Sequence, residues 1–332
     1  MAVVVFYGCF MVSPGLGAEE SPSGPLYQSN RFPTLLMVMT PVPHSPDPAP
    51  GRFHFNLQTD YTSVYINKQS GDYQVLTDME IGVVTPRFSA RAGKNLTFSV
   101  SVPFISYNGG FLDEILEDYH DAGHFPDYGR SSRPDNEFAC VVEKNGKTWF
   151  SPEQGGFHPG DSRVDLEYSL IRHPAFAGSL MYSLKLPTGD ADRGFGSGGV
   201  DQGLFALTRM TAGNFSLYLS PGVIFPQDPE TRGADISYDT MYTLFTGIEY
   251  TRSRAWSFMV QLNTMTSPLE NTGIDTLDDP GVELALGFTR RWDNVKASFS
   301  FCEDLSGTAP DFTVHAGIEI DFDISGKDGE KS

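Results

Sequence analysis

The sequence has few basic residues, few charges of any kind and no long apolar run, and these shortages exclude several classes of protein. The longest apolar run, residues 2–12, is shorter than the ~18 residues that a transmembrane helix needs, which excludes a helical membrane protein. Only 23 Lys and Arg stand against 42 Asp and Glu, a formal net charge of −19. Such an acidic chain repels phosphate, so we expect no nucleic acid partner.

The residues that are abundant favour an all-β protein. Aromatic residues make up 13% of the chain, which is too high for a disordered protein. The 34 Gly and 23 Pro require frequent turns. Many aromatic residues and turns, combined with few charges, are typical of strands joined by short connections. The length of 332 residues permits one large domain or two ordinary ones.

The first 18 residues have the features of a signal peptide. Residues 2–12 have the length of an apolar h-region, and the small residues Gly15, Gly17 and Ala18 follow. A positively charged n-region is missing, which leaves two alternatives: a start codon farther upstream, or a buried N-terminal strand or helix. We predict a signal peptide over 1–18 and therefore a mature chain in an oxidising compartment.

From residue 51 onward, apolar and polar residues alternate, as in half-buried strands. Val282, Leu284 and Leu286, for example, alternate with Glu283 and Ala285. The alternating segments run to roughly 10–12 residues, the length with which a tilted strand crosses a bilayer, whereas strands of globular proteins average about 5–6. Twelve strands are predicted, at 52–66, 73–91, 95–106, 162–172, 176–187, 201–211, 215–226, 238–251, 255–266, 281–291, 295–303 and 311–322.

The connections between these strands alternate in length. Turns of three residues, such as 92–94 and 212–214, alternate with longer loops, of which 107–161 is the longest. This layout is typical of outer-membrane barrels, whose short turns are periplasmic and whose long loops are extracellular. The predicted fold is therefore all-β: a transmembrane antiparallel β-barrel of about 12 strands over 51–322. A soluble β-sandwich is the alternative, but it gives no reason for loop lengths to alternate.

Two flanking segments do not fit the barrel pattern. Residues 19–50 are rich in proline, which cannot pair within a sheet, and we expect them to run beneath the barrel or to enter its lumen. Residues 323–332 form a polar tail. The barrel itself therefore begins near residue 51 and ends near residue 322.

The loop 107–161 is too long for a passive connection. Apolar residues recur with helical spacing from 111 to 119, and Asn145-Gly146 predicts a hairpin. The loop either folds inward and gates a pore or caps the barrel. The candidate ligand or gating residues are Phe111, Asp113, His120, Arg130, Arg133 and Asn136.

The motifs of this loop resemble those of a known family. The order G-G-F-L-D at 109–113, Tyr119-His120 and G-R-x-x-R-P-x-N at 129–136 is similar to that of a family of Gram-negative outer-membrane β-barrel proteins of unknown function. The similarity extends to Gly24-Pro25-Leu26 with Asn30 and in outline covers nearly the whole mature chain. The resemblance implies a fold and an outer-membrane location. It does not indicate an activity, because the family has no established one.

A second motif, L-P-T-G-D at 186–190 followed by G-S-G at 196–198, is similar to a loop of outer-membrane barrels that transport aromatic or apolar compounds. The alternative is structural, because glycine permits a tight turn at the barrel rim. The rim residues assigned on this basis are Pro187, Gly189, Asp190 and Asp201.

Charged residues on the polar strand faces are expected to line the lumen. They are Glu80, Arg87, Arg163, Asp165, Glu167, Lys185, Arg209, Glu249, Glu283, Lys296 and Glu319. Cys140 and Cys302 fall on the long-loop side of the membrane, where an inward-folded loop would let them form one disulfide.

No catalytic arrangement is evident. His315 is predicted to face inward and has no serine beside it in a nucleophile motif, and the loop carboxylates show no acid–base spacing. We expect no cofactor and no metal site. The favoured function is a passive channel or transporter for a small solute. The alternatives are a structural or surface-interaction barrel with a filled lumen and, less favoured, an outer-membrane lipid-modifying enzyme. Expected partners are outer-membrane lipid, lipopolysaccharide and the barrel-assembly machinery.

Overall fold

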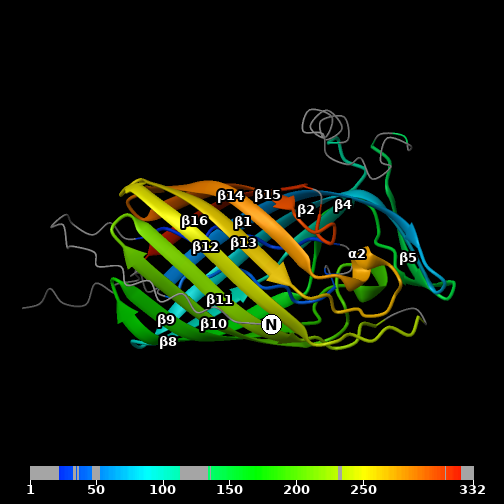
Figure 1. Ribbon diagram of the computed structural model, residues 1–332, viewed down its shortest axis with the longest axis horizontal. Coiled ribbons are helices and arrows are strands. Elements are labelled where there is room, and N and C mark those ends of the chain that lie inside the picture. The colour runs from blue at the N-terminus through cyan, green and yellow to red at the C-terminus, as the bar shows by residue number, and fades with distance from the viewer. Residues whose placement is uncertain are drawn as a thin grey trace, which may run out of the picture.

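The computed structural model describes residues 22–32, 35, 37–46, 53–112, 134, 136–230, 234–310 and 312–322. Their strands form one antiparallel sheet that closes on itself, because β1 pairs with β2 along one edge and with β16 along the other (Figure 1). The predicted signal peptide and the predicted polar tail lie outside the described residues.

Twelve strands make up the barrel wall, as predicted. They are β1 (Phe53–Gln69), β2 (Tyr73–Ala92), β3 (Leu96–Ser101) continued by β4 (Phe104–Asn108), β8 (Ser162–His173), β9 (Phe176–Leu186), β10 (Asp201–Ala212), β11 (Phe215–Phe225), β12 (Met241–Ser253), β13 (Trp256–Met265), β14 (Gly281–Trp292), β15 (Val295–Asp304) and β16 (Phe312–Phe322). The third wall strand is interrupted at Pro103, which has no N–H to donate to the ladder.

The long connection adds three short strands: β5 (Ala139–Lys144), β6 (Lys147–Phe150) and β7 (His158–Pro159). β5 pairs with the outer end of β2 and with β6, which confirms the hairpin predicted at Asn145-Gly146. β1 pairs with β16 only as far as Ser63, so the β1–β2 hairpin extends beyond the wall and carries β5 and β6 with it.

Helical structure is scarce in the described residues. A 3-10 turn, η2 (Ala191–Arg193), and a one-turn helix, α2 (Asp275–Asp278), both lie in long loops. Within the described ranges, no helix is long and apolar enough to cross a membrane. The helical pattern predicted at 111–119 falls almost entirely outside those ranges.

The outer face of the wall is apolar and the inner face is largely polar. On β14, Leu286 is 46% exposed while its neighbour Ala285 is fully buried, because successive side chains point to opposite faces. Aromatic rings gather on the outer face near the short turns, among them the neighbouring pairs Phe215–Tyr250 and Trp256–Phe288. Such belts mark the level of lipid head groups.

A hydrophobic core occupies the long-loop end of the barrel. It joins the extended β1–β2 hairpin, the β5–β6 hairpin, the loop that carries α2 and apolar residues from the N-terminal segment. Its members include Val75 on β2, Val142 on β5, Leu277 on α2, and Phe32 and Met39 from the N-terminal segment. The outer mouth is therefore covered by a packed cap.

A charge in the middle of the apolar wall tests the membrane assignment. We expect Leu286→Arg to lower the free energy of unfolding by about 2–4 kcal/mol, because the guanidinium would face hydrocarbon. Leu305→Arg is the control, since Leu305 is 56% exposed in the loop after β15. Refolding into lipid vesicles, followed by heat-modifiable gel migration, measures both variants. Equal costs at the two positions would contradict the membrane assignment.

Candidate functional site: a luminal segment and its anchors

The described residues of 22–46, called here the luminal segment, run inside the barrel. The segment starts near the short turns, where the backbone N–H groups of Ser23 and Gly24 donate to the Glu249 carboxylate over 2.8 and 3.2 Å. Lys296 Nζ donates to the Ser23 carbonyl over 2.9 Å. Gln261 holds both backbone groups of Leu26, accepting from its N–H at 2.6 Å and donating to its carbonyl at 3.2 Å. Side chains of the wall thus form the backbone hydrogen bonds that the segment would otherwise form by pairing with a strand.

The segment then rises to the long-loop end of the lumen. Gln28 Nε2 donates to the Glu283 carbonyl, near the start of β14, over 3.5 Å. Phe32 and Leu35 line a small pocket with Met265 and Leu277, beneath the loop that carries α2. The tip of the segment is therefore part of the hydrophobic cap.

A buried charge cluster fixes the rising part of the segment. Arg31 on the segment donates to Asp60 of β1, with Nη2 2.6 Å and Nε 3.2 Å from Oδ2. His315 of β16 places Nδ1 2.5 Å from the other oxygen of Asp60. The hydroxyl of Tyr27 accepts a hydrogen bond from Arg31 over 3.1 Å. Because the Asp60 side chain is fully buried, these partners replace the water that it loses.

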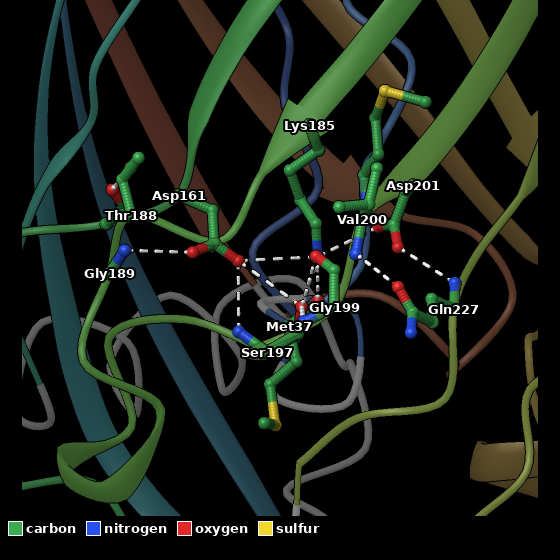
Figure 2. Close-up of polar contacts among 12 residues, drawn as sticks. Met37, Asp161, Lys185, Thr188, Gly189, Ser197, Gly199, Val200, Asp201 and Gln227 are labelled. Atoms are coloured by element: carbon green, nitrogen blue, oxygen red, sulfur yellow. Dashed lines mark hydrogen bonds and ion pairs between the residues drawn. The ribbon is translucent and has the colours of Figure 1, made fainter.

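A second cluster fixes the segment to the opposite wall (Figure 2). Lys185 Nζ on β9 lies 2.9 Å from Asp201 Oδ2 and 3.4 Å from Asp161 Oδ2. It also donates to the Met37 carbonyl over 2.7 Å and to Ser197 Oγ over 2.5 Å. Asp201 Oδ2 in turn accepts the Met39 N–H at 2.7 Å. One lysine and one aspartate therefore hold two backbone groups of the segment.

The loop between β9 and β10, residues 187–200, is called here the rim loop, and it contacts this second cluster through Asp161. Asp161 accepts the N–H of Gly189 over 3.0 Å and the N–H of Ser197 over 2.9 Å (Figure 2). A Cβ at Gly189 would lie 2.1 Å from the Phe195 carbonyl oxygen, and one at Gly196 would lie 2.5 Å from Asp161 Oδ1. Only glycine fits at either position, which gives the L-P-T-G-D and G-S-G motifs a structural reason.

The four predicted rim residues differ in their contacts and in their exposure. Gly189 and Asp201 belong to the second cluster, and Asp201 Oδ1 also accepts the Gln227 N–H over 3.1 Å (Figure 2). Asp190 lies outside it and caps η2, with Oδ1 3.2 Å from the N–H of Arg193. Pro187 is exposed.

The segment then descends along β8. Arg163 Nη1 donates to the Thr40 carbonyl over 2.8 Å, and its Nε donates to Asp165 over 2.7 Å. Arg87 Nη1 donates to the other oxygen of Asp165 over 2.6 Å. Two arginines thus share one buried carboxylate, and one of them also holds the segment.

The remaining predicted luminal residues also lie on the inner face, with one exception. Ser179 Oγ donates to Glu167 over 2.7 Å, Lys296 lies 3.0 Å from Glu319, and Arg209 pairs across the strands with the buried Tyr218. The exception is Glu80.

Glu80 faces outward, which corrects the sequence interpretation. It accepts hydrogen bonds from the Tyr61 hydroxyl and from the backbone N–H groups of Phe111 and Leu112, beneath the start of the long loop. Its neighbour Ile81 and the more distant Arg87 face inward. Since strand side chains alternate with a period of two, Glu80 and Arg87 cannot share a face.

Of the six gating residues predicted in the long loop, Phe111 and Asn136 belong to the described part of the chain. Phe111 stacks on Tyr61 with ring centroids 5.4 Å apart, on the outer side of the wall. Asn136 has a positive φ of 60° and lies beside Gly109. Asp113, His120, Arg130 and Arg133 lie outside the described residues, so gating by them stays a prediction.

The structure holds Cys140 and Cys302 as free, buried thiols, so the predicted pairing between them is wrong. Cys140 lies on β5 opposite Thr77 of β2, with its Sγ 3.8 Å from Thr77 Oγ1. Cys302 lies on β15 opposite Thr313 of β16. β1 and β16 separate β2 from β15 in the sheet, so the two thiols belong to different parts of the wall.

The sequence interpretation missed several residues that hold the segment. Asp60 and Gln261 stand on the polar faces of alternating strands, so alternation could have marked them as luminal. Arg31 and Asp161 lie in segments without periodicity, where no local signal distinguishes them. Among the described residues, no group of three or more His, Cys, Asp and Glu side chains could hold a metal ion.

We expect both thiols to react with maleimide only after unfolding. Both are buried, and burial raises the pKa of the Cys140 thiol to about 12, so little of the reactive thiolate forms. Mass spectrometry after labelling in detergent, with and without denaturant, measures this. A label at both positions in the denatured, unreduced chain and at neither position in the folded chain is the expected result. A denatured, unreduced chain without labels at these positions would contradict the free thiols.

Replacing the lysine of the second cluster should loosen the segment. Lys185→Met leaves Asp161 and Asp201 buried without their cation, which should cost about 3–5 kcal/mol of stability. We also expect faster proteolysis between residues 22 and 46. Lys147→Met is the matched control, since Lys147 is exposed on the β5–β6 hairpin. The same proteolysis rate in both variants would show that the cluster does not hold the segment.

Comparison with known proteins identifies a family. The KdgM porin is 10% identical, with a TM-score of 0.44 over 81% of this chain and 99% of that chain. The NanC porin is 6% identical, with 0.48 over 81% and 100%, and the P. putida toluene transporter TodX is 11% identical, with 0.38 over 88% and 94%. Similarity at this level carries no information about activity. No curated protein matches the sequence. The family model for proteins of unknown function, DUF3187, matches residues 4–322, and the chain therefore belongs to that family.

Proposed function

We propose that this protein is a channel for a small solute in the outer membrane of a Gram-negative bacterium, and that the luminal segment closes it. The observation that carries the proposal is the way in which the segment is held. Its described residues form no strand, and polar side chains of the wall bind its backbone. Such contacts can break and reform while the hydrogen bonds of the wall stay intact.

The closed state is supported by the burial of the luminal side chains. A water-filled bore would expose the polar groups along it, whereas Glu249 and Asp201 are fully buried and Gln261 is 2% exposed. The cap at the outer mouth includes Phe32 and Met39 of the same segment. A solute could therefore pass only if the luminal segment moves.

The proposed location rests on the two faces of the wall. An apolar exterior with aromatic belts suits a bilayer, and closed barrels of this kind belong to outer membranes. Lipid and lipopolysaccharide are then the surrounding partners, and the barrel-assembly machinery inserts the chain. No catalytic role is part of the proposal, because His315 is engaged with Asp60 in holding the segment.

A second candidate is a surface-interaction barrel with a permanently filled lumen. It is favoured by the ion pairs of Asp60, Asp165 and Lys185. These pairs neutralise the three buried charges within the protein, so none of the three side chains is left to bind a charged solute. In that case the segment is a fixed part of the core and the cap is the functional surface.

Conductance in planar bilayers separates the two candidates. We expect the mature chain to be closed most of the time and a variant lacking residues 22–46 to conduct steadily, because deletion empties the lumen. A variant lacking residues 323–332 is the control and should behave like the mature chain. If the deletion variant folds, as shown by heat-modifiable migration, and still does not conduct, the channel is contradicted and the filled barrel is favoured.

A further inference from the structure

Three arginines near one another at the short-turn end have no acidic partner. Arg290 is exposed on β14, Arg252 is exposed near the end of β12, and Arg254 is exposed in the turn that follows. Within the described part of the chain, none of the three guanidinium groups forms a salt bridge or donates a hydrogen bond. Their positive charge is therefore not neutralised by the protein.

Arg290 is positioned by two aromatic rings. Its guanidinium carbon lies 4.9 Å from the ring centroid of Trp256 and 4.6 Å from that of Trp292. Trp256 stands opposite Arg290 in the β13–β14 ladder. Stacking on aromatic faces fixes the guanidinium plane and leaves its N–H donors free to bind an anion.

The wall next to these residues is apolar. Moving away from the short turns, the outer face presents Phe288, Leu286, Phe258 and Val260, each 37% exposed or more. Tryptophan belts lie at the level of lipid head groups, and short turns are periplasmic, so the arginines lie at the inner-leaflet interface. An acyl chain could follow the wall while its head group reaches the arginines.

The geometry points to a binding site for the phosphate of an anionic glycerophospholipid, formed by Arg290 between Trp256 and Trp292, with Arg254 and Arg252 adding positive charge. Guanidinium groups bind phosphate through paired charge-assisted hydrogen bonds. This inference rests on the membrane location proposed above and is independent of channel activity.

Tryptophan fluorescence gives a direct readout, because the chain has only three tryptophans and two of them form the site. The third, Trp149, is buried in the cap. The folded protein in detergent micelles would be titrated with phosphatidylglycerol brominated in its acyl chain. We expect quenching that saturates, and an affinity about tenfold lower for Arg290→Gln.

Three variants and one competitor decide the outcome. Lys94→Gln removes one charge from the exposed turn between β2 and β3 and should leave the affinity unchanged. Arg290→Lys keeps the charge but loses the planar stack. Its affinity for the lipid should therefore lie between the affinities of Arg290→Gln and Lys94→Gln. Inorganic phosphate should displace the lipid only weakly, because it lacks the acyl contact.

Several results would overturn the inference. One is an equal loss of affinity in Arg290→Gln and Lys94→Gln, which would indicate general electrostatic attraction. Another is an unchanged affinity in Arg290→Gln, and a third is displacement by phosphate at the concentration of the lipid. Heat-modifiable migration of every variant shows that the barrel is folded. Failure of that migration in the unmodified protein would instead contradict the membrane location.

Discussion

The width of a twelve-stranded barrel is the constraint on which the other features of this structure depend. Barrels of about eight strands can fill their interior with wall side chains, whereas wider barrels leave a space at the axis. Here the inner face is polar, because the outer face takes the apolar residues of each alternating strand. A polar wall around an empty axis would be an open bore. The luminal segment occupies that space, and its backbone offers the N–H and carbonyl groups that wall side chains such as Gln261 require.

Charge pairing sets the position of the segment. A buried charge is tolerated only with partners, and the removal of one partner costs more than the pair itself contributes. Asp60 lies between Arg31 and His315, and Lys185 lies between Asp161 and Asp201. These two clusters stand on opposite walls and hold the segment on either side of its turn. A shift of the segment along the axis would separate Arg31 from Asp60, so the clusters determine its register as well as its stability.

Strand positions could be predicted from the sequence because period and turn chemistry are local properties. The twelve wall strands and the hairpin at Asn145-Gly146 follow from them, whereas the single strand predicted over 95–106 is divided at Pro103, which has no N–H for the ladder. The face on which a charge lies depends on its position along the strand: Glu80 and Arg87 are both polar, but an odd separation on β2 puts them on opposite faces. The path of the luminal segment depends on contacts such as Ser23 with Glu249, 226 residues apart, which no local pattern encodes. The cysteine pairing failed for a similar reason, since it assumed that the long loop folds inward.

The L-P-T-G-D and G-S-G motifs of the rim loop are connected to the luminal segment through one continuous set of polar contacts. Asp161 binds the backbone of the glycine-containing loop on one side and faces Lys185 on the other. Lys185 and Asp201 then hold Met37 and Met39. The glycines matter because a side chain at Gly189 or Gly196 would push the loop away from Asp161. Asp161 would then lose two N–H donors, and its carboxylate would no longer be held beside Lys185. A sequence motif that by itself suggests only a tight turn at the rim therefore contributes, through one carboxylate and one lysine, to holding the luminal segment in place.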